Sequence, residues 1–119
     1  RRTPQWGVTA PPVFMAITAA AGGDWVQVDA GAAIVQLQLA AYALGLGCCW
    51  IGAFDHAAAD RILQLSAGMR TVYLVAVGYP AESPVRDDIG GDGEVGYYLD
   101  AADILHVPKY TVDAITDWR

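Results

Sequence analysis

Charged residues are scarce in this chain. Only 17% of its 119 residues are charged, and lysine occurs once, as Lys109. Thirteen acidic residues outnumber seven basic ones, and the net charge of −6 argues against a protein that binds nucleic acid through its phosphates. The apolar fraction of 55% is too high for a disordered chain. A single small domain normally needs more charge to cover its surface. We therefore expect one small domain with apolar surface that lies in a membrane or against another chain.

Cysteine is also rare, and the two that occur, Cys48 and Cys49, are adjacent. Neighbouring cysteines meet disulfide geometry only with strain. A metal site would need further ligands at suitable spacing, whereas the two histidines, His56 and His106, are far apart in the sequence. We expect two small, buried, reduced thiols without a redox or metal role, and histidines that cap helices or lie in loops.

One uncharged stretch of 25 residues, 30–54, is long enough to span a membrane. Gln36 and Gln38 lie in its first half, Gly45 and Gly47 interrupt it further along, and no Lys or Arg flanks it. A buried helix followed by a buried strand is the favoured interpretation, and a membrane-associated helix is the weaker one. The first residues do not follow the order of a signal peptide, so the expected compartment is the cytoplasm.

The order of the predicted elements indicates an α+β fold. Apolar runs, caps and turn residues predict a strand at 13–19, a helix at 30–44, a strand at 48–54, a helix at 56–65 and a central strand at 71–78. Asp29 and Asp55 are the expected N-caps. The first helix has apolar residues on nearly every face, so we expect it to be buried all round.

The domain organisation follows from composition. Residues 1–10 are interpreted as an N-terminal stub or linker, residues 11–82 as half of an α/β core, and residues 83–119 as an extended C-terminal tail. Residues 83–103 are rich in Asp, Gly and Pro. The tail lacks a core of its own and is expected to reach a partner or a ligand. Three strands are few to bury such a helix, so the sequence resembles the second half of a larger sandwich.

Four stretches follow one another as they do in a known family: ALGLG at 43–47, WIGAFD at 50–55, VYLVAVGYPAE at 72–82 and HVPK at 106–109. Their order and spacing resemble the C-terminal half of the FMN-dependent nitroreductase superfamily. The resemblance covers roughly residues 11–112. It is closest to the dehydrogenase-like branch, which includes azoline-forming peptide oxidases and cyclic dipeptide oxidases.

The resemblance implies an α+β sandwich that dimerises through long helices and holds FMN between two chains. It also implies that the flavin carries out hydride transfer while the protein positions it. Trp50, Ile51, Gly52 and Ala53 match the segment that passes the flavin ring, with the Gly52 backbone N–H nearest to flavin N5. An N–H donor suits this acceptor nitrogen, because no titrating side chain is needed. The alternative is an ordinary buried strand with a small residue for packing.

Lys109 matches a basic residue that pairs with the FMN phosphate in the family. A second basic residue often follows two positions later there, but this chain has Thr111. The family's N-terminal phosphate motif and its contact to the pyrimidine ring have no counterpart here, and residues 1–3 (RRT) are interpreted as part of the stub. We therefore expect a second polypeptide, or an N-terminal half of the same one, to complete the flavin site.

Three functions are compatible with these residues. The favoured one is part of an FMN-dependent oxidoreductase that acts on a small molecule or peptide within a homo- or hetero-oligomer. The second is a non-catalytic structural or assembly subunit of a flavoprotein complex, and the third is the membrane-associated helix. Nitroaromatics, azolines, cyclic dipeptides and quinones all remain possible substrates, and the electron donor or acceptor is either NAD(P)H or oxygen. No nucleic-acid, membrane or metal partner is expected.

Overall fold

The computed structural model describes residues 11–119, which form two compact units, residues 11–80 and residues 81–119. Each unit has one three-stranded sheet. The predicted position of residues 1–3 as part of a stub lies outside the described residues. Within residues 11–119, no helix is both long enough and apolar enough to cross a membrane.

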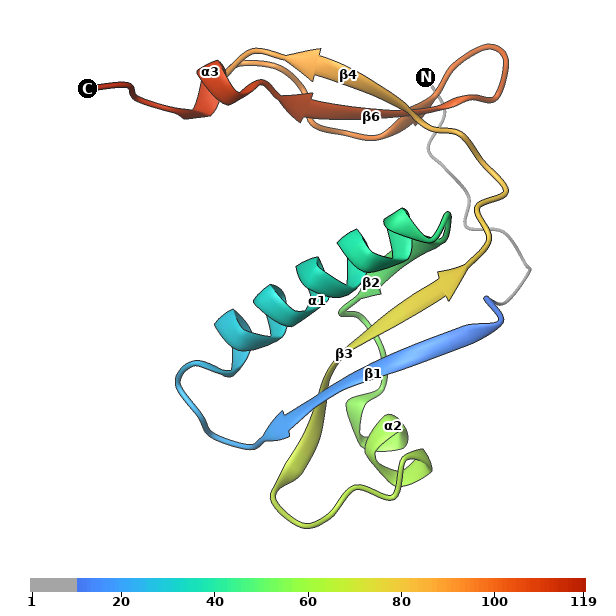
Figure 1. The fold of residues 1–119 in the computed structure, drawn as a ribbon, viewed down its shortest axis with the longest axis vertical. Coiled ribbons are helices and arrows are strands. Elements are labelled where there is room, and N and C mark those ends of the chain that lie inside the picture. Colours follow the sequence, from blue (N-terminus) through green and yellow to red (C-terminus); the bar gives the residue numbers. More distant parts are fainter. Residues whose placement is uncertain (1–10) are drawn as a thin grey trace. The chain divides into compact units, whose positions relative to one another are not determined.

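The first unit is built on an antiparallel sheet. Its strands are β1 (Val13–Ala20), β3 (Met69–Gly78) and β2 (Gly47–Ile51), and β3 lies between the other two, as the sequence predicts (Figure 1). Val13 pairs with Val77 and Gly47 with Gly78, so both neighbours run antiparallel to β3. β2 is therefore an edge strand of this sheet among the described residues, and one side of its backbone is open to a ligand or another strand.

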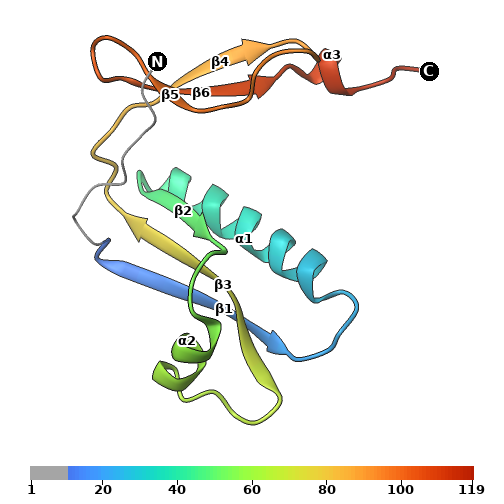
Figure 2. The ribbon, with the colours of Figure 1, turned by 180° about the vertical axis from the view of Figure 1, so that it is seen from behind.

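Helix α1 (Val26–Ala43) follows β1 and lies along the sheet (Figures 1 and 2). The predicted N-cap at Asp29 is wrong, because the helix begins one turn earlier and Trp25 occupies the cap position without a side-chain hydrogen bond. Asp29 lies in the first turn instead, where its charge still interacts favourably with the helix dipole. Gly45 adopts a φ of +72°, the left-handed conformation that ends the helix where expected.

Two apolar stripes lie on opposite sides of α1. One stripe, Ala30, Ile34 and Ala41, is buried on the side of the helix that packs on the sheet. The other stripe is exposed and consists of Val28, Val35, Leu39 and Tyr42, whose spacings of seven, four and three residues place them on one face. The prediction of a helix buried all round is therefore wrong for this chain by itself. The second apolar stripe is exposed in this chain.

Helix α2 (His56–Ile62) begins where the sequence predicts and ends three residues earlier than the expected 65. The Asp55 carboxylate accepts a hydrogen bond from the Ala58 N–H at 2.9 Å, so the predicted N-cap is confirmed. The helix lies beside the first half of β3 (Figures 1 and 2).

Both cysteines lie on β2 and are free thiols. Cys48 is half-buried, but Cys49 is exposed, so the prediction of two buried thiols is wrong for Cys49. Neighbouring side chains of a strand point to opposite faces of the sheet. The two cysteines therefore lie on opposite faces, and they differ in exposure.

The second unit contains a sheet that composition did not reveal. Its strands are β4 (Val85–Ile89), β6 (Leu105–Tyr110) and β5 (Tyr98–Leu99), and β6 is central, parallel to β4 and antiparallel to β5. A short helix, α3 (Val112–Ile115), follows, and the Thr111 hydroxyl caps it by accepting from the Ala114 N–H. The tail is thus not merely extended, as we expected, because strand pairing gives it structure of its own.

Candidate functional site

The predicted flavin-contacting segment lies at the end of the edge strand β2. Trp50 and Ile51 are the last residues of the strand and pair with Val75 and Leu74 on β3. Gly52 and Ala53 continue beyond the pairing. The four predicted residues therefore form one continuous stretch where the backbone leaves the sheet.

Trp50 is held by the elements on both sides of it. Its indole meets the ring of Tyr73 edge to face, with centroids 4.9 Å apart. From α1, a Cβ built at Gly31 would lie 3.8 Å from the Trp50 ring, which is ordinary van der Waals contact, so the helix backbone passes close to the indole. The Trp50 side chain nevertheless stays 41% exposed. An aromatic surface in a fixed orientation is thus available beside Gly52.

Gly52 is not required by packing. A Cβ at this position would meet only the Tyr73 ring, at 3.5 Å, which is ordinary van der Waals contact. Its φ is not in the positive range that favours glycine, since the positive φ values among the described glycines are at Gly22, Gly45 and Gly68. The alternative explanation of a small residue needed for packing therefore receives no support. A bare backbone beside an exposed indole fits a planar ring that approaches the main chain closely.

Tyr73 connects this segment to α1. Its hydroxyl donates a hydrogen bond to the side-chain oxygen of Gln27, in the first turn of the helix. The tyrosine ring therefore touches Trp50 on β2 and fixes the start of α1 at the same time. Because this hydrogen bond restricts the Tyr73 ring, the Trp50 indole packs against a side chain of fixed orientation.

A polar cleft of about 330 Å³ lies where α2 meets β3. The His56 ring nitrogen Nδ1 lies 2.9 Å from the Thr71 carbonyl oxygen, and the Thr71 N–H donates to the Asp60 carboxylate at 2.7 Å. The nearby Thr71 hydroxyl and the Thr71 N–H lower the pKa of Asp60. His56 therefore links α2 to the central strand β3, a contact that the sequence does not predict.

An open apolar groove of about 330 Å³ adjoins the exposed stripe of α1. Its lining residues are Val35, Gln38, Leu39, Tyr42, Leu46, Gly47 and Cys48. The groove therefore runs from the outer face of α1 to the start of β2, the strand that ends at Trp50. A protein surface of this kind is typical of contact with another chain.

Lys109 lies near the end of β6, in the second unit. Its ammonium donates a hydrogen bond to the Tyr97 hydroxyl at 3.0 Å and lies 5.2 Å from the centre of that ring. The side chain is exposed, so the cation remains accessible to an anion. The predicted site residues thus fall into two groups on separate units, with Trp50–Ala53 on one and Lys109 on the other.

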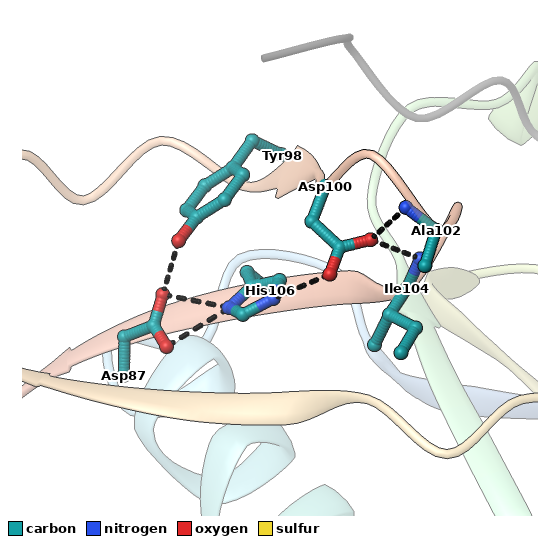
Figure 3. Close-up of polar contacts among 6 residues, drawn as sticks. All are labelled: Asp87, Tyr98, Asp100, Ala102, Ile104 and His106. Carbon is teal, nitrogen blue, oxygen red and sulfur yellow. Dashed lines mark hydrogen bonds and ion pairs between the residues drawn. The ribbon is translucent and has the colours of Figure 1, made fainter.

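Sequence reasoning missed a polar cluster centred on His106, which lies in strand β6 and not in a loop as expected (Figure 3). One ring nitrogen of His106 lies 2.9 and 3.0 Å from the two carboxylate oxygens of Asp87, and the other lies 3.5 Å from Asp100. Tyr98 stacks on the imidazole with ring centres 4.7 Å apart and donates its hydroxyl to Asp87 at 2.8 Å. Three segments are thus joined at one imidazole.

Charge stabilises this cluster. The hydrogen bond to Asp87 raises the pKa of His106 above its usual value of 6.5, and Asp100 adds to the effect. The Ile104 N–H and the Ala102 N–H, which donate to Asp100 at 2.9 and 2.8 Å, lower the pKa of that carboxyl group. At pH 6.5 and below, the arrangement therefore favours an imidazolium that donates to carboxylates on both sides.

The stability of the second sheet should therefore depend on pH. A raised His pKa contributes stability that is complete below 6.5 and is lost as the pH rises through the folded-state pKa. The lowered pKa of Asp100 contributes stability above its usual value of 3.8, which is lost as the pH falls through the folded-state value. We expect amide hydrogen exchange of residues 98–106, corrected for intrinsic rates, to be slowest at mildly acidic pH and about threefold faster at pH 9.

In His106→Gln, this increase at alkaline pH should disappear, since no group titrates at that position. An equal increase in the variant would show that His106 does not control the stability of the sheet.

Comparison with known proteins defines the class to which this fold belongs. A nitroreductase family protein from Clostridium novyi NT has a TM-score of 0.54 and 26% identity, over 59% of this chain and 44% of that one. The nitroreductase family protein from Streptococcus pneumoniae TIGR4 has a TM-score of 0.53 and 26% identity, over 81% of this chain and 38% of that one. This chain therefore spans less than half the length of either structure. Among curated proteins, none matches it significantly.

The model of the nitroreductase family matches residues 5–79. This chain belongs to the nitroreductase family. The predicted resemblance is thus confirmed at the level of the family, and the partial coverage of both solved structures agrees with an α+β domain that is present only in part. The family match includes residues 50–53 and ends before the second unit, which carries Lys109 and His106.

Proposed function

We propose that this chain forms part of the flavin site of an FMN-dependent oxidoreductase and that a second polypeptide completes the site. Membership of the nitroreductase family supports flavin chemistry, since its members are typically FMN-dependent oxidoreductases. The observation that carries the proposal is the open backbone at Gly52, beside the exposed and firmly held indole of Trp50.

Each residue would have a limited task. The Gly52 N–H donates to an acceptor nitrogen of the ring, and Trp50 with Ile51 and Ala53 forms the surface along which the ring lies. Lys109 supplies positive charge for the phosphate. When bound, FMN supplies hydride transfer, and the protein contributes orientation and the exclusion of water.

The exposed apolar surfaces support the proposal of a partner. The outward stripe of α1 and the groove beside it are apolar, and water is a poor environment for such a surface. We infer that this face packs against a second polypeptide, either another copy of this chain or a different subunit. We further propose that the protein is cytoplasmic and that its substrate is a small molecule or a peptide. Within the family, we place it in the dehydrogenase-like branch, which includes azoline-forming and cyclic dipeptide oxidases.

The absorption spectrum of the protein, purified with the polypeptides that accompany it in cells, tests this function. We expect flavin bands in the visible range, release of FMN on denaturation and bleaching of the bands by a chemical reductant. A colourless assembly that gains no flavin on incubation with FMN would contradict the proposal. In that case, a non-catalytic subunit becomes the better description.

A further inference from the structure

Two faces of the second sheet carry different chemistry. Partners in a ladder point to the same side of a sheet, and successive residues alternate. The pairing of His106 with Val85 and Tyr98 therefore places His106, Asp87 and Tyr98 on one face. Lys109 lies on the opposite face together with Tyr97, which precedes Tyr98 by one residue. The two clusters thus share the strands but not the surface.

The Lys109–Tyr97 pair has unused hydrogen-bonding capacity. An ammonium group has three N–H donors, and one of them points to the Tyr97 hydroxyl. That hydroxyl accepts from Lys109 through its oxygen and keeps its own O–H as a donor. Both groups lie on exposed residues. Two donors 3.0 Å apart, one of them charged, can hold two oxygens of one phosphate.

We propose that Tyr97 and Lys109 act as a pair that binds the phosphate of the flavin nucleotide, and that His106 is a positioning residue that holds Tyr97 in place from the other face of the sheet. The inference rests on the proposed function for the identity of the nucleotide. The neutral phenol would then serve in place of the second basic residue, which is absent because position 111 is threonine.

His106 can position Tyr97 because its contacts hold β5, and Tyr97 is bonded directly to the first residue of that strand. Asp87 from β4, Tyr98 from β5 and Asp100 from the turn after β5 all face His106. These contacts fix β5 against β6, and Tyr97 is the residue directly before β5. When His106 loses its proton, its second nitrogen presents a lone pair to the Asp100 carboxylate, and the attraction becomes repulsion. The hold on β5 then weakens, and Tyr97 moves more freely beside Lys109.

Arg86 and Asp88 lie on the same face as Lys109, because Asp88 pairs with Lys109 in the parallel ladder. They form an ion pair at 2.7 Å, and both side chains are 61% exposed. Their charges cancel, so neither dominates the field at Lys109. We therefore expect Arg86→Lys, which keeps a positive charge beside Asp88, to change phosphate affinity less than Tyr97→Phe does.

The first experiment needs no flavin. Lys109 is the only lysine of the chain, so its acylation by an amine-reactive reagent can be followed by peptide mass spectrometry. We expect His106→Gln to raise the rate about threefold at pH 6.5, and the wild-type rate, relative to that of free Nα-acetyl-lysine, to rise with pH while the variant stays level. His56→Gln, in the other unit, is the control and should leave the rate unchanged. Equal rates in wild type and His106→Gln across the pH range would overturn the positioning role.

The second experiment tests the pair in the assembled holoprotein. Tyr97→Phe keeps the ring and removes only the hydroxyl, so we expect the affinity for FMN to fall about tenfold while that for riboflavin, which has no phosphate, is unchanged. An unchanged affinity for FMN, or an equal loss for both flavins, would overturn the role of Tyr97.

If the wild-type assembly binds no flavin, the proposed function fails, and inorganic phosphate becomes the probe. Millimolar phosphate should then still slow acylation of Lys109 in the wild type and not in Tyr97→Phe. Absence of this protection would overturn the oxyanion pair itself.

Discussion

Replacing Gly52 by proline is expected to weaken the binding of FMN to the assembled protein by at least about tenfold. Proline lacks the N–H that we assign to the flavin ring, and loss of a hydrogen bond to a buried partner costs about 1–3 kcal/mol. Flavin fluorescence titration of the assembly measures the affinity directly.

Gly52→Ala is the matched control for this experiment. It keeps the N–H and adds a methyl group at ordinary contact distance from Tyr73, so the affinity should change by less than about threefold. Titration with 5-deaza-FMN, in which the acceptor nitrogen is replaced by carbon, should show little difference between the proline and alanine variants. If proline and alanine bind FMN equally well, the backbone of Gly52 does not contact the flavin.

A charge on the outer stripe of α1 is expected to dissociate the assembly. Leu39 is 66% exposed in this chain, so Leu39→Asp should leave its folding almost unchanged. If the stripe is covered in the assembly, as we propose, the variant buries an unpaired carboxylate there. Association should then weaken by at least about tenfold, as judged by analytical ultracentrifugation.

Ile34→Ala, on the opposite side of the same helix, should behave in the reverse way. Ile34 is fully buried against the sheet, and its truncation should lower the free energy of unfolding by about 3 kcal/mol. Assembly of the fraction that remains folded should be unchanged. An intact assembly in Leu39→Asp would show that this face of α1 is not an interface.

Much of the first unit could be predicted from the sequence because its signals are local. Asp55 caps a helix with its own side chain, Gly45 ends one through a positive φ, and the β-branched run in β3 is long enough to be central. The start of α1 was missed because Asp29 is an equally good residue for a first turn. The two stripes of α1 could not be separated, because a helix with apolar residues on opposite sides has the same composition as a fully buried one.

The second sheet could not be predicted because its pairing is nonlocal. In β4, three of the five residues are charged, and the central strand β6 contains Pro108, which usually argues against a central position. Its order comes instead from the side chains around His106, which link residues up to 19 positions apart. The sequence around His106 does not indicate which distant side chains it contacts. Only the register of β4 and β5 against β6 shows that Asp87, Tyr98 and Asp100 lie around His106.

The candidate site shows the same division. The sequence placed residues 50–53 in one continuous segment, and the structure adds the reason that Trp50 is fixed, namely Tyr73 and its hydrogen bond to Gln27. For Lys109, the sequence suggested a phosphate contact, whereas its partner Tyr97 emerged only from the geometry. Side chains that cooperate across strands remain hidden until the strands are paired.

Titration of FMN with this chain alone, and again with the polypeptide that completes it, tests the central claim most directly. The account predicts no saturable quenching of flavin fluorescence by the chain alone, and stoichiometric, reducible flavin once the partner is present. Tight binding of FMN by the chain alone, or a complete assembly that binds none, would contradict it.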